Sequence, residues 1–595
     1  MRVPLQTRYE GTNKMRREAA RFNFNRLACV AAGLALWLAH GPVLAQALLG
    51  GIANVVTGNH TCALTIAGTV KCWGANFFGE LGDNSTTERL TPVDVISGPS
   101  LPVLSGVSAI SAGLNHTCAL VNSGVKCWGA NSFGQLGDGS VTQRLTPVDV
   151  IGLTSGVAAI AAGGIHTCAL TVLGGVKCWG DNAAGKLGNN SFLLVGSPVP
   201  VDVITLPTLG ALSGVVAVAA GSEHTCAIIS GGGMKCWGQN IHGELGINIA
   251  PILQISRTPL DVVGLAGGVA AISLGAQHTC ALVASGGLQC WGNNLAGQVG
   301  DNANVNRLVP VDVLGLTAGV AVIEAGIIHT CALTTTGGAK CWGRNGNGQL
   351  GDNSTNDSAV AVDVVSLTAG ATAISAGADH TCAVTASGGV KCWGRNGNGQ
   401  LGNNTNTLRL TPVDVLVPPP IALSGVKSRK THAAAGNFDL LLDTIPIISG
   451  AVTVESRSNG ASHLIVFQFT RPISASGIAT AVNGSGAPIT IGAVNFLGND
   501  VSVTLTGVAD NSRARVSLSG VNTDATLNPS VSLGFLVGDV NNTGSVNSSD
   551  ISGVKARSGQ TTDLTNFKFD LNASGTINSS DISAVKARSG LILPP

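Results

Sequence analysis

The sequence contains few charged and few aromatic residues for its length. Charged residues occupy 11% of the 595 positions and aromatic residues 4%, with a single tyrosine. The hydrophobic fraction of 44% therefore comes mainly from alanine, valine, leucine and isoleucine, and 81 glycines accompany it. This composition is typical of many short strands joined by glycine turns, and the length allows two or three independent cores.

Clusters of basic residues are absent after the N-terminal segment. The formal net charge is +1, but the first 45 residues contain seven basic and two acidic side chains, which leaves the remainder near −4. Binding to nucleic acid depends on lysine and arginine side chains that neutralise phosphates. A mildly acidic chain of this kind argues against nucleic acid as a partner.

No apolar run is long enough to span a bilayer, which needs about 20 residues. The run from Leu27 to Leu38 follows basic residues and precedes the small-residue end Val43-Leu44-Ala45-Gln46-Ala47. These three parts predict a cleaved secretory signal over residues 1–47 rather than a membrane anchor. We therefore expect a secreted protein, either extracellular or associated with the cell surface.

A His-Thr-Cys repeat dominates the next 370 or so residues. Its seven copies begin at His60, His116, His166, His224, His278, His329 and His380. The spacings of 50 to 58 residues suit one four-stranded propeller blade per copy. Alternating apolar and polar positions bounded by glycines predict short antiparallel strands, with the variation in length confined to one loop. A single blade cannot bury its own faces, so seven copies predict a complete ring.

Fourteen of the fifteen cysteines lie in this repeat, two in each copy. Six pairs are ten residues apart and one is nine apart, which places the two cysteines opposite each other across a hairpin in every copy. Export provides an oxidising environment, so the spacing predicts one cross-strand disulfide per blade. The alternative is metal ligation by cysteine and histidine, for which a fourth ligand is missing. The predicted pairs are Cys62–Cys72, Cys118–Cys127, Cys168–Cys178, Cys226–Cys236, Cys280–Cys290, Cys331–Cys341 and Cys382–Cys392.

The consensus HTCALTxxGGVKCWGxNxxGQLG resembles the repeat of the regulator of chromosome condensation family, whose members form seven-bladed propellers. The resemblance covers about residues 50–417, and Trp73, Trp128, Trp179, Trp237, Trp291, Trp342 and Trp393 match the family's Trp-Gly. It implies an all-β propeller over residues 48–417. Guanine-nucleotide exchange, the activity of the family's nuclear founder, does not suit an exported acidic chain. Secreted bacterial members that bind protein partners, including one that inhibits a β-lactamase, resemble the chain better.

Polar residues that recur in every copy are expected to satisfy backbone groups rather than to catalyse a reaction. They comprise the histidines, Asn76, Asn131, Asn182, Asn240, Asn294, Asn345 and Asn396, and Asp94, Asp149, Asp202, Asp261, Asp312, Asp363 and Asp414. Only unrepeated loops, such as GINIAPILQISR in the fourth copy, could then carry specificity. These loops contain no recognisable catalytic set, so no catalytic residue is assigned.

Two further units are predicted after the repeat. A proline-rich linker at 418–423 is followed by alternating segments over 424–537, which predict an immunoglobulin-like β-sandwich that acts as a spacer. Residues 538–595 contain a duplication whose halves each fit a twelve-residue calcium loop followed by a short helix. The expected ligands are Asp539, Asn541, Thr543, Ser545, Asn547 and Asp550 in the first loop, and Asp570, Asn572, Ser574, Thr576, Asn578 and Asp581 in the second.

This paired arrangement resembles a type I dockerin, a calcium-dependent module that binds a cohesin domain. The resemblance implies two Ca²⁺ sites, and each loop supplies only two carboxylates, which should make them weak. It also implies cohesin contacts through Ser548, Ser549, Ser579 and Ser580, rimmed by Lys555, Arg557, Lys586 and Arg588. A degenerate module that binds calcium but no partner is the alternative.

The leading hypothesis is therefore a non-catalytic binding or scaffold protein. The propeller would recognise an extracellular protein or glycan, and the C-terminal module would attach it to a cohesin-like partner. The main alternative is a polysaccharide-degrading enzyme, because dockerins often accompany glycoside hydrolases. A propeller that inhibits an enzyme is the third possibility.

Overall fold

The computed structural model describes residues 47–417, except 99–101, 192–195 and 250–253, and part of the chain from 423 to 589. In that second part, the residues without a description are 433–435, 443–452, 456–461, 471–472, 474–477, 484–486, 498, 509–511, 520, 522–528, 536–545, 547, 563–565, 570 and 572–575. The predicted secretory signal and linker lie almost entirely outside the described residues. So do the predicted calcium ligands Asp539, Asn541, Thr543, Ser545, Asn547, Asp570, Asn572 and Ser574.

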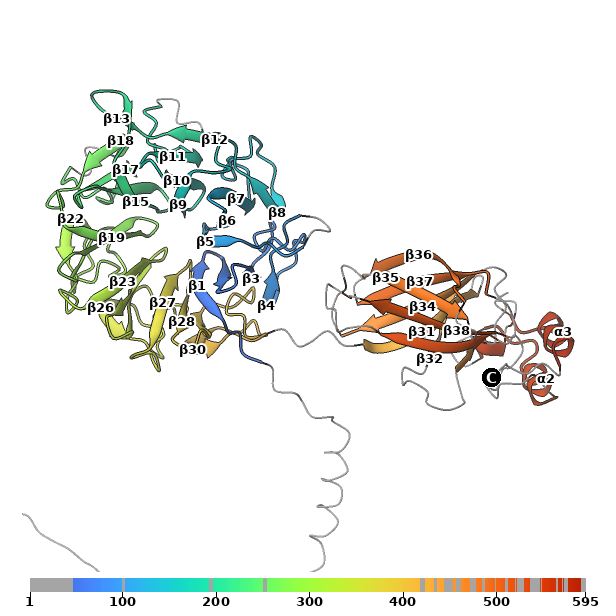
Figure 1. Ribbon diagram of the computed structural model, residues 1–595. Helices are drawn as coiled ribbons and strands as arrows, with labels where there is room; N and C mark the ends of the chain where they lie inside the picture. Colours follow the sequence, from blue (N-terminus) through green and yellow to red (C-terminus); the bar gives the residue numbers. More distant parts are fainter. Residues whose placement is uncertain are drawn as a thin grey trace, which may run out of the picture.

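Seven four-stranded antiparallel sheets form a ring, which confirms the predicted seven-bladed propeller (Figure 1). Blades 1 to 3 comprise β1 (Ile52–Thr57), β2 (His60–Thr65), β3 (Val70–Gly74) and β4 (Arg89–Asp94); β5 (Val107–Ala112), β6 (His116–Val121), β7 (Gly124–Gly129) and β8 (Arg144–Asp149); and β9 (Val157–Ala162), β10 (His166–Thr171), β11 (Val176–Gly180) and β12 (Ser197–Asp202). Blades 4 and 5 comprise β15 (Val215–Ala220), β16 (His224–Ile229), β17 (Met234–Gln239) and β18 (Ile255–Asp261); and β19 (Val269–Leu274), β20 (His278–Val283), β21 (Leu288–Gly292) and β22 (Arg307–Asp312). Blades 6 and 7 comprise β23 (Val320–Ala325), β24 (His329–Thr334), β25 (Ala339–Gly343) and β26 (Ser358–Asp363); and β27 (Ala371–Ala376), β28 (His380–Thr385), β29 (Val390–Gly394) and β30 (Arg409–Asp414).

Every blade is one continuous stretch of sequence, and its strands pair in chain order. The ring closes where β1 contacts β27 and β28. Flanking residues support this closure, because Leu48 pairs with Leu416 and the backbone N–H of Leu49 donates to the carbonyl of Val415 at 2.9 Å. The two ends of the propeller therefore lie next to each other.

The hydrophobic core lies between successive blades rather than within one. The second and third strands of one blade supply apolar side chains such as Cys62 and Leu64, and the next blade supplies Ala119 and the completely buried Trp128. The same arrangement recurs around the ring, including the cluster that joins blade 7 to blade 1 through Trp73 and Cys382. One tryptophan per blade thus compensates for the low aromatic content.

Variation in blade length falls in two loops, so the prediction of one variable loop was wrong. Blades 3 and 4 have longer connections between their third and fourth strands. Blades 1 and 3 have longer connections after their fourth strands, and the second of these forms a small hairpin of β13 (Ile204–Thr205) and β14 (Gly210–Ala211). The fourth strand of a blade is its outer edge, so both loops can lengthen without disturbing the core.

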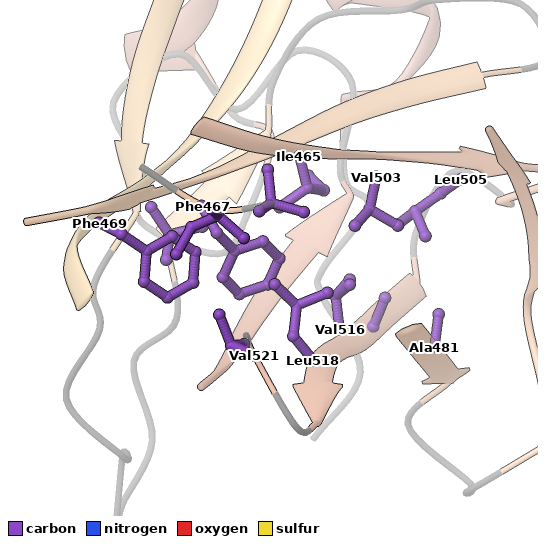
Figure 2. Packing of buried hydrophobic residues seen from close by; sticks show 13 residues of the cluster. Ile465, Phe467, Phe469, Ala481, Val503, Leu505, Val516, Leu518 and Val521 are labelled. Carbon is purple, nitrogen blue, oxygen red and sulfur yellow. The ribbon is translucent and has the colours of Figure 1, made fainter. Parts of the chain in front are cut away.

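A sandwich of two sheets follows the propeller. The first sheet has the order β32-β31-β34-β37-β36 and the second β33-β39-β38-β35, with β33 and β39 parallel. Alternate residues such as Ile465, Phe467, Val516 and Leu518 meet between the sheets to form the core (Figure 2). The strands are β31 (Leu423–His432), β32 (Gly436–Leu442), β33 (Thr453–Glu455), β34 (Ser462–Phe469), β35 (Ile478–Asn483), β36 (Thr490–Leu497), β37 (Asp500–Thr506), β38 (Ser512–Ser519) and β39 (Ser530–Phe535). The immunoglobulin-like connectivity stays a prediction.

Two short helices form the C-terminal part of the described chain. They are α2 (Ser548–Lys555) and α3 (Ser579–Ala587), which contact each other, with the 3-10 turn η2 (Phe567–Phe569) between them in the sequence. Val554 and Val585 are completely buried in a small core with Phe569 and Leu571. None of the helices in the described chain is long and apolar enough to cross a bilayer.

Candidate binding sites

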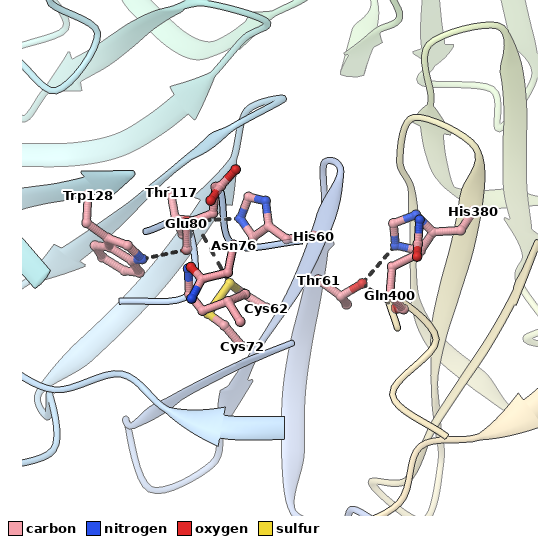
Figure 3. Close-up of a disulfide and its surroundings, with 11 residues drawn as sticks. His60, Thr61, Cys62, Cys72, Asn76, Glu80, Thr117, Trp128, His380 and Gln400 are labelled. Atoms are coloured by element: carbon pink, nitrogen blue, oxygen red, sulfur yellow. Dashed lines mark hydrogen bonds between the residues drawn. A yellow bond between two sulfur atoms is a disulfide. The ribbon is translucent and has the colours of Figure 1, made fainter. Parts of the chain in front are cut away.

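The two cysteines of each blade face each other across the second and third strands and form a disulfide. In blade 1, Cys62 and Cys72 are direct partners in the strand register, with a Cα–Cα distance of 4.1 Å (Figure 3). The register is kept because most blades have a three-residue turn, whereas blade 2 has the two-residue turn Asn122-Ser123 with positive φ at both positions. All fourteen sulfurs belong to completely buried residues, so they are closed to solvent and to partners.

The repeated histidines form a ring of hydrogen bonds that joins neighbouring blades. His60 Nε2 lies 2.6 Å from Thr117 Oγ1 of the next blade, and His380 Nε2 of blade 7 lies 2.7 Å from Thr61 Oγ1 (Figure 3). The threonine hydroxyl donates its proton to a backbone carbonyl, as Thr117 does to Glu80 at 3.0 Å. The histidine Nε2 must therefore carry a proton and donate. The same carbonyl accepts from the Trp128 indole at 2.8 Å, so both of its lone pairs are used.

The histidines are neutral because their burial disfavours the protonated, charged form. Each Nδ1 is buried with no hydrogen-bond partner among the described residues. Burial lowers the pKa of His60, His224, His278 and His380 to about 3 and that of His116 and His329 to about 4, and it lowers the pKa of His166 well below its ordinary value. Neighbouring histidines add a smaller Coulombic contribution in most of these cases. A general base that works at neutral pH would need a higher pKa.

The repeated asparagines satisfy backbone groups, as expected. Asn76 Oδ1 accepts from the N–H of Leu81 at 3.0 Å, and its Nδ2 donates to the carbonyl of Thr87 at 2.9 Å. The repeated aspartates differ, because they accept from a side chain on the neighbouring strand. Asp94 pairs with Lys71 at 2.6 Å, and Asp312 accepts from Gln289 Nε2 at 2.9 Å. The histidines also bind a side chain rather than a backbone group.

A buried lysine distinguishes the junction of blades 3 and 4. Lys186 is completely buried, and its Nζ lies 2.8 Å from Asp181 Oδ2 and 2.6 Å from Glu223 Oε2. The other blades have glutamine or glutamate at this position. The sequence reasoning missed this triad, although that difference between copies could have revealed it.

A pocket of about 220 Å³ lies at the junction of blades 7 and 1. We call it the seam pocket, and the polar or aromatic side chains that line it include Asn59, Phe77, Asn115, Asp379, Arg395 and Asn398. A second cavity, of about 70 Å³, lies on the ring axis and is lined mainly by glycine and alanine. The axial cavity offers few side-chain groups to a ligand, whereas the seam pocket offers several.

Four of the twelve predicted calcium ligands are described, namely Asp550, Thr576, Asn578 and Asp581. Asp550 and Asp581 are completely buried in the first turns of α2 and α3. Asp581 accepts from the N–H groups of Leu571 at 2.8 Å and Asn578 at 2.9 Å, one on each oxygen. Asn578 caps α3 by accepting from the N–H of Ser580 at 2.8 Å. These four residues lie in the C-terminal halves of the predicted calcium loops. The atoms through which they could bind a calcium ion are all oxygens.

The predicted cohesin contacts lie on the two helices or just after them, and they differ in exposure. Ser548, Ser549, Ser579 and Ser580 are exposed, as are Lys555 and Lys586. Arg557 and Arg588 are half-buried instead, and each donates to the carbonyl four residues earlier, at 3.1 and 3.2 Å. Arg557 also stacks over the Phe569 ring, 3.8 Å from its centre. The serines and lysines are accessible to a partner, while the arginines stabilise the module itself.

Comparison with known families gives two matches along the chain. Residues 38–371 and 152–442 match the family described as the RCC1-like domain, and residues 537–588 match the Dockerin type I domain. The first match covers the propeller, and the second covers the paired loops and helices.

Comparison with single proteins gives the same picture for the propeller. The chain is 31% identical over 392 residues to the Ultraviolet-B receptor UVR8 of Arabidopsis thaliana, covering 64% of this chain and 84% of that protein. It is 33% identical over 353 residues to the probable E3 ubiquitin-protein ligase HERC4 of Homo sapiens, covering 58% of this chain but only 32% of that protein. Among solved structures, Prp20p from Saccharomyces cerevisiae aligns with a TM-score of 0.51 at 24% identity, over 59% of this chain and 87% of that one. The structural likeness concerns the fold alone.

Proposed function

Because the chain belongs to the RCC1-like domain family over residues 38–442 and carries a type I dockerin domain, we propose that it is a secreted, non-catalytic binding protein. Its propeller recognises an extracellular protein or glycan, and its C-terminal module attaches it to a cohesin-like partner when Ca²⁺ is bound. The observation that carries the proposal is the pair of loop–helix units, each with a completely buried aspartate at its twelfth position.

The chemistry of the two predicted loops supports calcium binding. Removal of a carboxylate from water is unfavourable unless a cation or several N–H groups compensate its charge. Asp550 and Asp581 are both completely buried. Asp581 accepts one backbone N–H on each of its two carboxylate oxygens. Together with the other predicted oxygen ligands they would hold one ion per loop, and the ion would fix the loop ends against α2 and α3.

The binding function is favoured over hydrolysis by the roles of the repeated polar groups. A glycoside hydrolase needs two carboxylates across a cleft. Asp94 and its counterparts instead pair with lysine or glutamine on the adjacent strand. The repeated histidines are buried and neutral, and they bind threonines of the next blade. A polysaccharide hydrolase would be revived by turnover that is lost when two unrepeated acids are replaced.

The test uses the full chain and a panel of purified type I cohesin domains. We expect capture of the chain by at least one cohesin in the presence of Ca²⁺ and release by chelator, and titration calorimetry should detect two calcium sites. The variant that replaces both Asp550→Ala and Asp581→Ala should lose both signals.

A matched control is the variant with Asp94→Ala, which removes a carboxylate that the dockerin module does not use. It should bind cohesin as the unmodified chain does. Capture that is equal in calcium and chelator, or that survives in the double aspartate variant, would refute the docking role. Calcium binding without capture by any cohesin would favour a degenerate module.

A further inference from the structure

The seam pocket collects groups from three blades at one end of the ring. Asp379, Arg395 and Asn398 come from blade 7, Asn59 and Phe77 from blade 1, and Asn115 from blade 2. All of them follow the first or third strand of their blade, so they lie on the same face of the propeller. A volume of about 220 Å³ is below the range of about 300–1,000 Å³ for drug-sized ligands, which suits a single ring.

Several polar side chains in the pocket are held in place by hydrogen bonds. Asn59 Nδ2 donates to Asn115 Oδ1 at 2.9 Å, and Arg395 Nη1 lies 3.3 Å from Asp379 Oδ2. Asn398 donates from Nδ2 to Glu88 Oε2 at 3.0 Å, and its backbone N–H donates to Gln400 Oε1 at 2.9 Å. Each amide has two donors and an acceptor with two lone pairs, so these bonds use only part of its capacity. The pocket thus presents fixed planar groups that both donate and accept.

Phe77 adds an apolar surface to these amides. Phe77 is 61% exposed, more than Phe133 at 48% or Phe78 at 38%, whereas all seven propeller tryptophans are completely buried. Exposing the apolar surface of a large aromatic ring to water is unfavourable. An aromatic ring beside planar donors and acceptors matches a sugar ring, which has one face of C–H groups and an edge of neighbouring hydroxyls.

The charges in the pocket favour an uncharged ligand. Arg395 is its one cationic side chain, and this guanidinium is already paired with Asp379. An anionic ligand would have to compete with Asp379 for the guanidinium, and a cationic ligand would have to compete with the guanidinium for Asp379. A polyol needs neither charge and gains from both as hydrogen-bond partners.

Corresponding positions in the other blades lack this combination. The position of Phe77 is occupied by Ser132, Ala183, Ile241, Leu295, Gly346 and Gly397 in blades 2 to 7. Blade 6 carries Arg344 where blade 7 carries Arg395, but the following blade has glycine in place of the phenylalanine. The aromatic ring and the arginine therefore meet only where blade 7 joins blade 1.

We infer that the seam pocket binds one neutral sugar residue of a polysaccharide, stacked on Phe77 and hydrogen-bonded by Asn59, Asn398 and the Arg395–Asp379 pair. The inference rests on the proposed binding function and makes it more specific, because it selects a glycan over a protein as the target of the propeller. The chain would then attach a polysaccharide to whatever its C-terminal module binds.

Affinity electrophoresis of the full chain in gels that contain xylan, glucomannan, mixed-linkage β-glucan or starch tests the inference, with insoluble cellulose in a pull-down and polygalacturonate as a charged comparison. We expect at least one neutral polymer to retard the chain. The variants Phe77→Ala and Asn398→Ala should weaken that binding at least tenfold. Phe133→Ala and Arg344→Ala remove similar side chains that do not line the pocket and should bind normally. Tryptophan fluorescence and the intact mass with seven disulfides verify that each variant is folded.

The inference is overturned if no neutral polymer binds, if only polygalacturonate binds, or if Phe133→Ala and Arg344→Ala weaken binding as much as the pocket variants. Capture of a purified protein partner that Phe77→Ala abolishes, without polysaccharide binding, would also overturn it. The calcium-dependent capture by cohesin is measured on the same variants. Absence of cohesin capture in the unmodified chain would count against the proposed function. Cohesin capture without polysaccharide binding would count against the glycan pocket alone.

Discussion

Acid should destabilise the propeller far more than its low content of charged residues suggests. The seven ring histidines are neutral in the folded protein, because burial lowers the pKa of six of them to about 3 or 4 and that of His166 well below the ordinary value of 6.5. Their contribution to stability is therefore fully present above pH 6.5 and is lost as the pH falls from 6.5 towards 3. The unfolded chain binds protons in this range, and the folded chain does not.

The size of the effect follows from these values. At pH 5 each histidine lowers the free energy of unfolding by about 2 kcal/mol relative to pH 8, so seven together lower it by about 14 kcal/mol. Glu324 acts in the opposite direction, because burial raises its pKa to about 7, and its protonation recovers about 2 kcal/mol. The net loss is comparable to the whole stability of a typical domain, about 5–15 kcal/mol.

The assay is thermal unfolding followed by tryptophan fluorescence at pH 8, 6.5 and 5, since the seven propeller tryptophans lie between blades. We expect the Tm to fall by on the order of 15 °C between pH 8 and pH 5. The variant His278→Gln keeps an N–H donor for Thr330 but cannot be protonated, so its loss between pH 8 and pH 5 should be smaller by about 2 kcal/mol. A Tm at pH 5 equal to that at pH 8 would refute the reasoning, as would an identical pH profile for the variant.

Three further predictions concern buried groups. Reductant alone should leave all seven disulfides intact, because the cysteines are completely buried; a chain reduced and alkylated in denaturant should not regain its native fluorescence, because each bridge contributes about 3 kcal/mol, and its recovery would contradict the structural role. Glu324→Gln should raise the free energy of unfolding by about 3 kcal/mol at pH 8 but by less than about 1 kcal/mol at pH 5, because burial raises the carboxyl pKa to about 7; an equal gain in denaturant unfolding at both pH values would point to packing instead. Lys186→Met should lower the free energy of unfolding by about 3 kcal/mol, because Asp181 and Glu223 lose the buried cation between them; the added change Asp181→Ala should recover part of it, and additive losses in the double variant would show that the charges are not coupled.

Features that repeat along the chain could be predicted from the sequence. A spacing of nine residues with a two-residue turn predicts that Cys118 and Cys127 lie opposite each other. The structure contains this turn and the cross-strand disulfide. The hydrogen bonds that Asn76 makes to the backbone are also local, because their partners lie within eleven residues. Local contacts of this kind leave a periodic signal, which seven copies reinforce.

Features that depend on the neighbouring blade could not be predicted in the same way. A threonine follows every repeated histidine, as Thr117 follows His116. Its hydrogen bond to the histidine of the preceding blade becomes evident only when blade 2 is placed against blade 1. The seam pocket joins residues 59 to 115 with residues 379 to 398, which are distant in the sequence and differ between copies. The parallel pairing of β33 with β39 in the sandwich is equally non-local. Such contacts depend on how the ring closes and how the sheets pair. They leave no repeating pattern in the sequence from which they could be predicted.

The closure of the ring fixes the end of the propeller from which the chain enters and leaves. Residues 47–49 and 415–417 pair where the fourth strand of blade 7 ends and the first strand of blade 1 begins. The seam pocket lies after the first and third strands, and thus at the opposite end of the ring axis. Both connections therefore leave the propeller from the end of the ring axis that does not carry the pocket, so the chain segments beyond them need not pass across its opening.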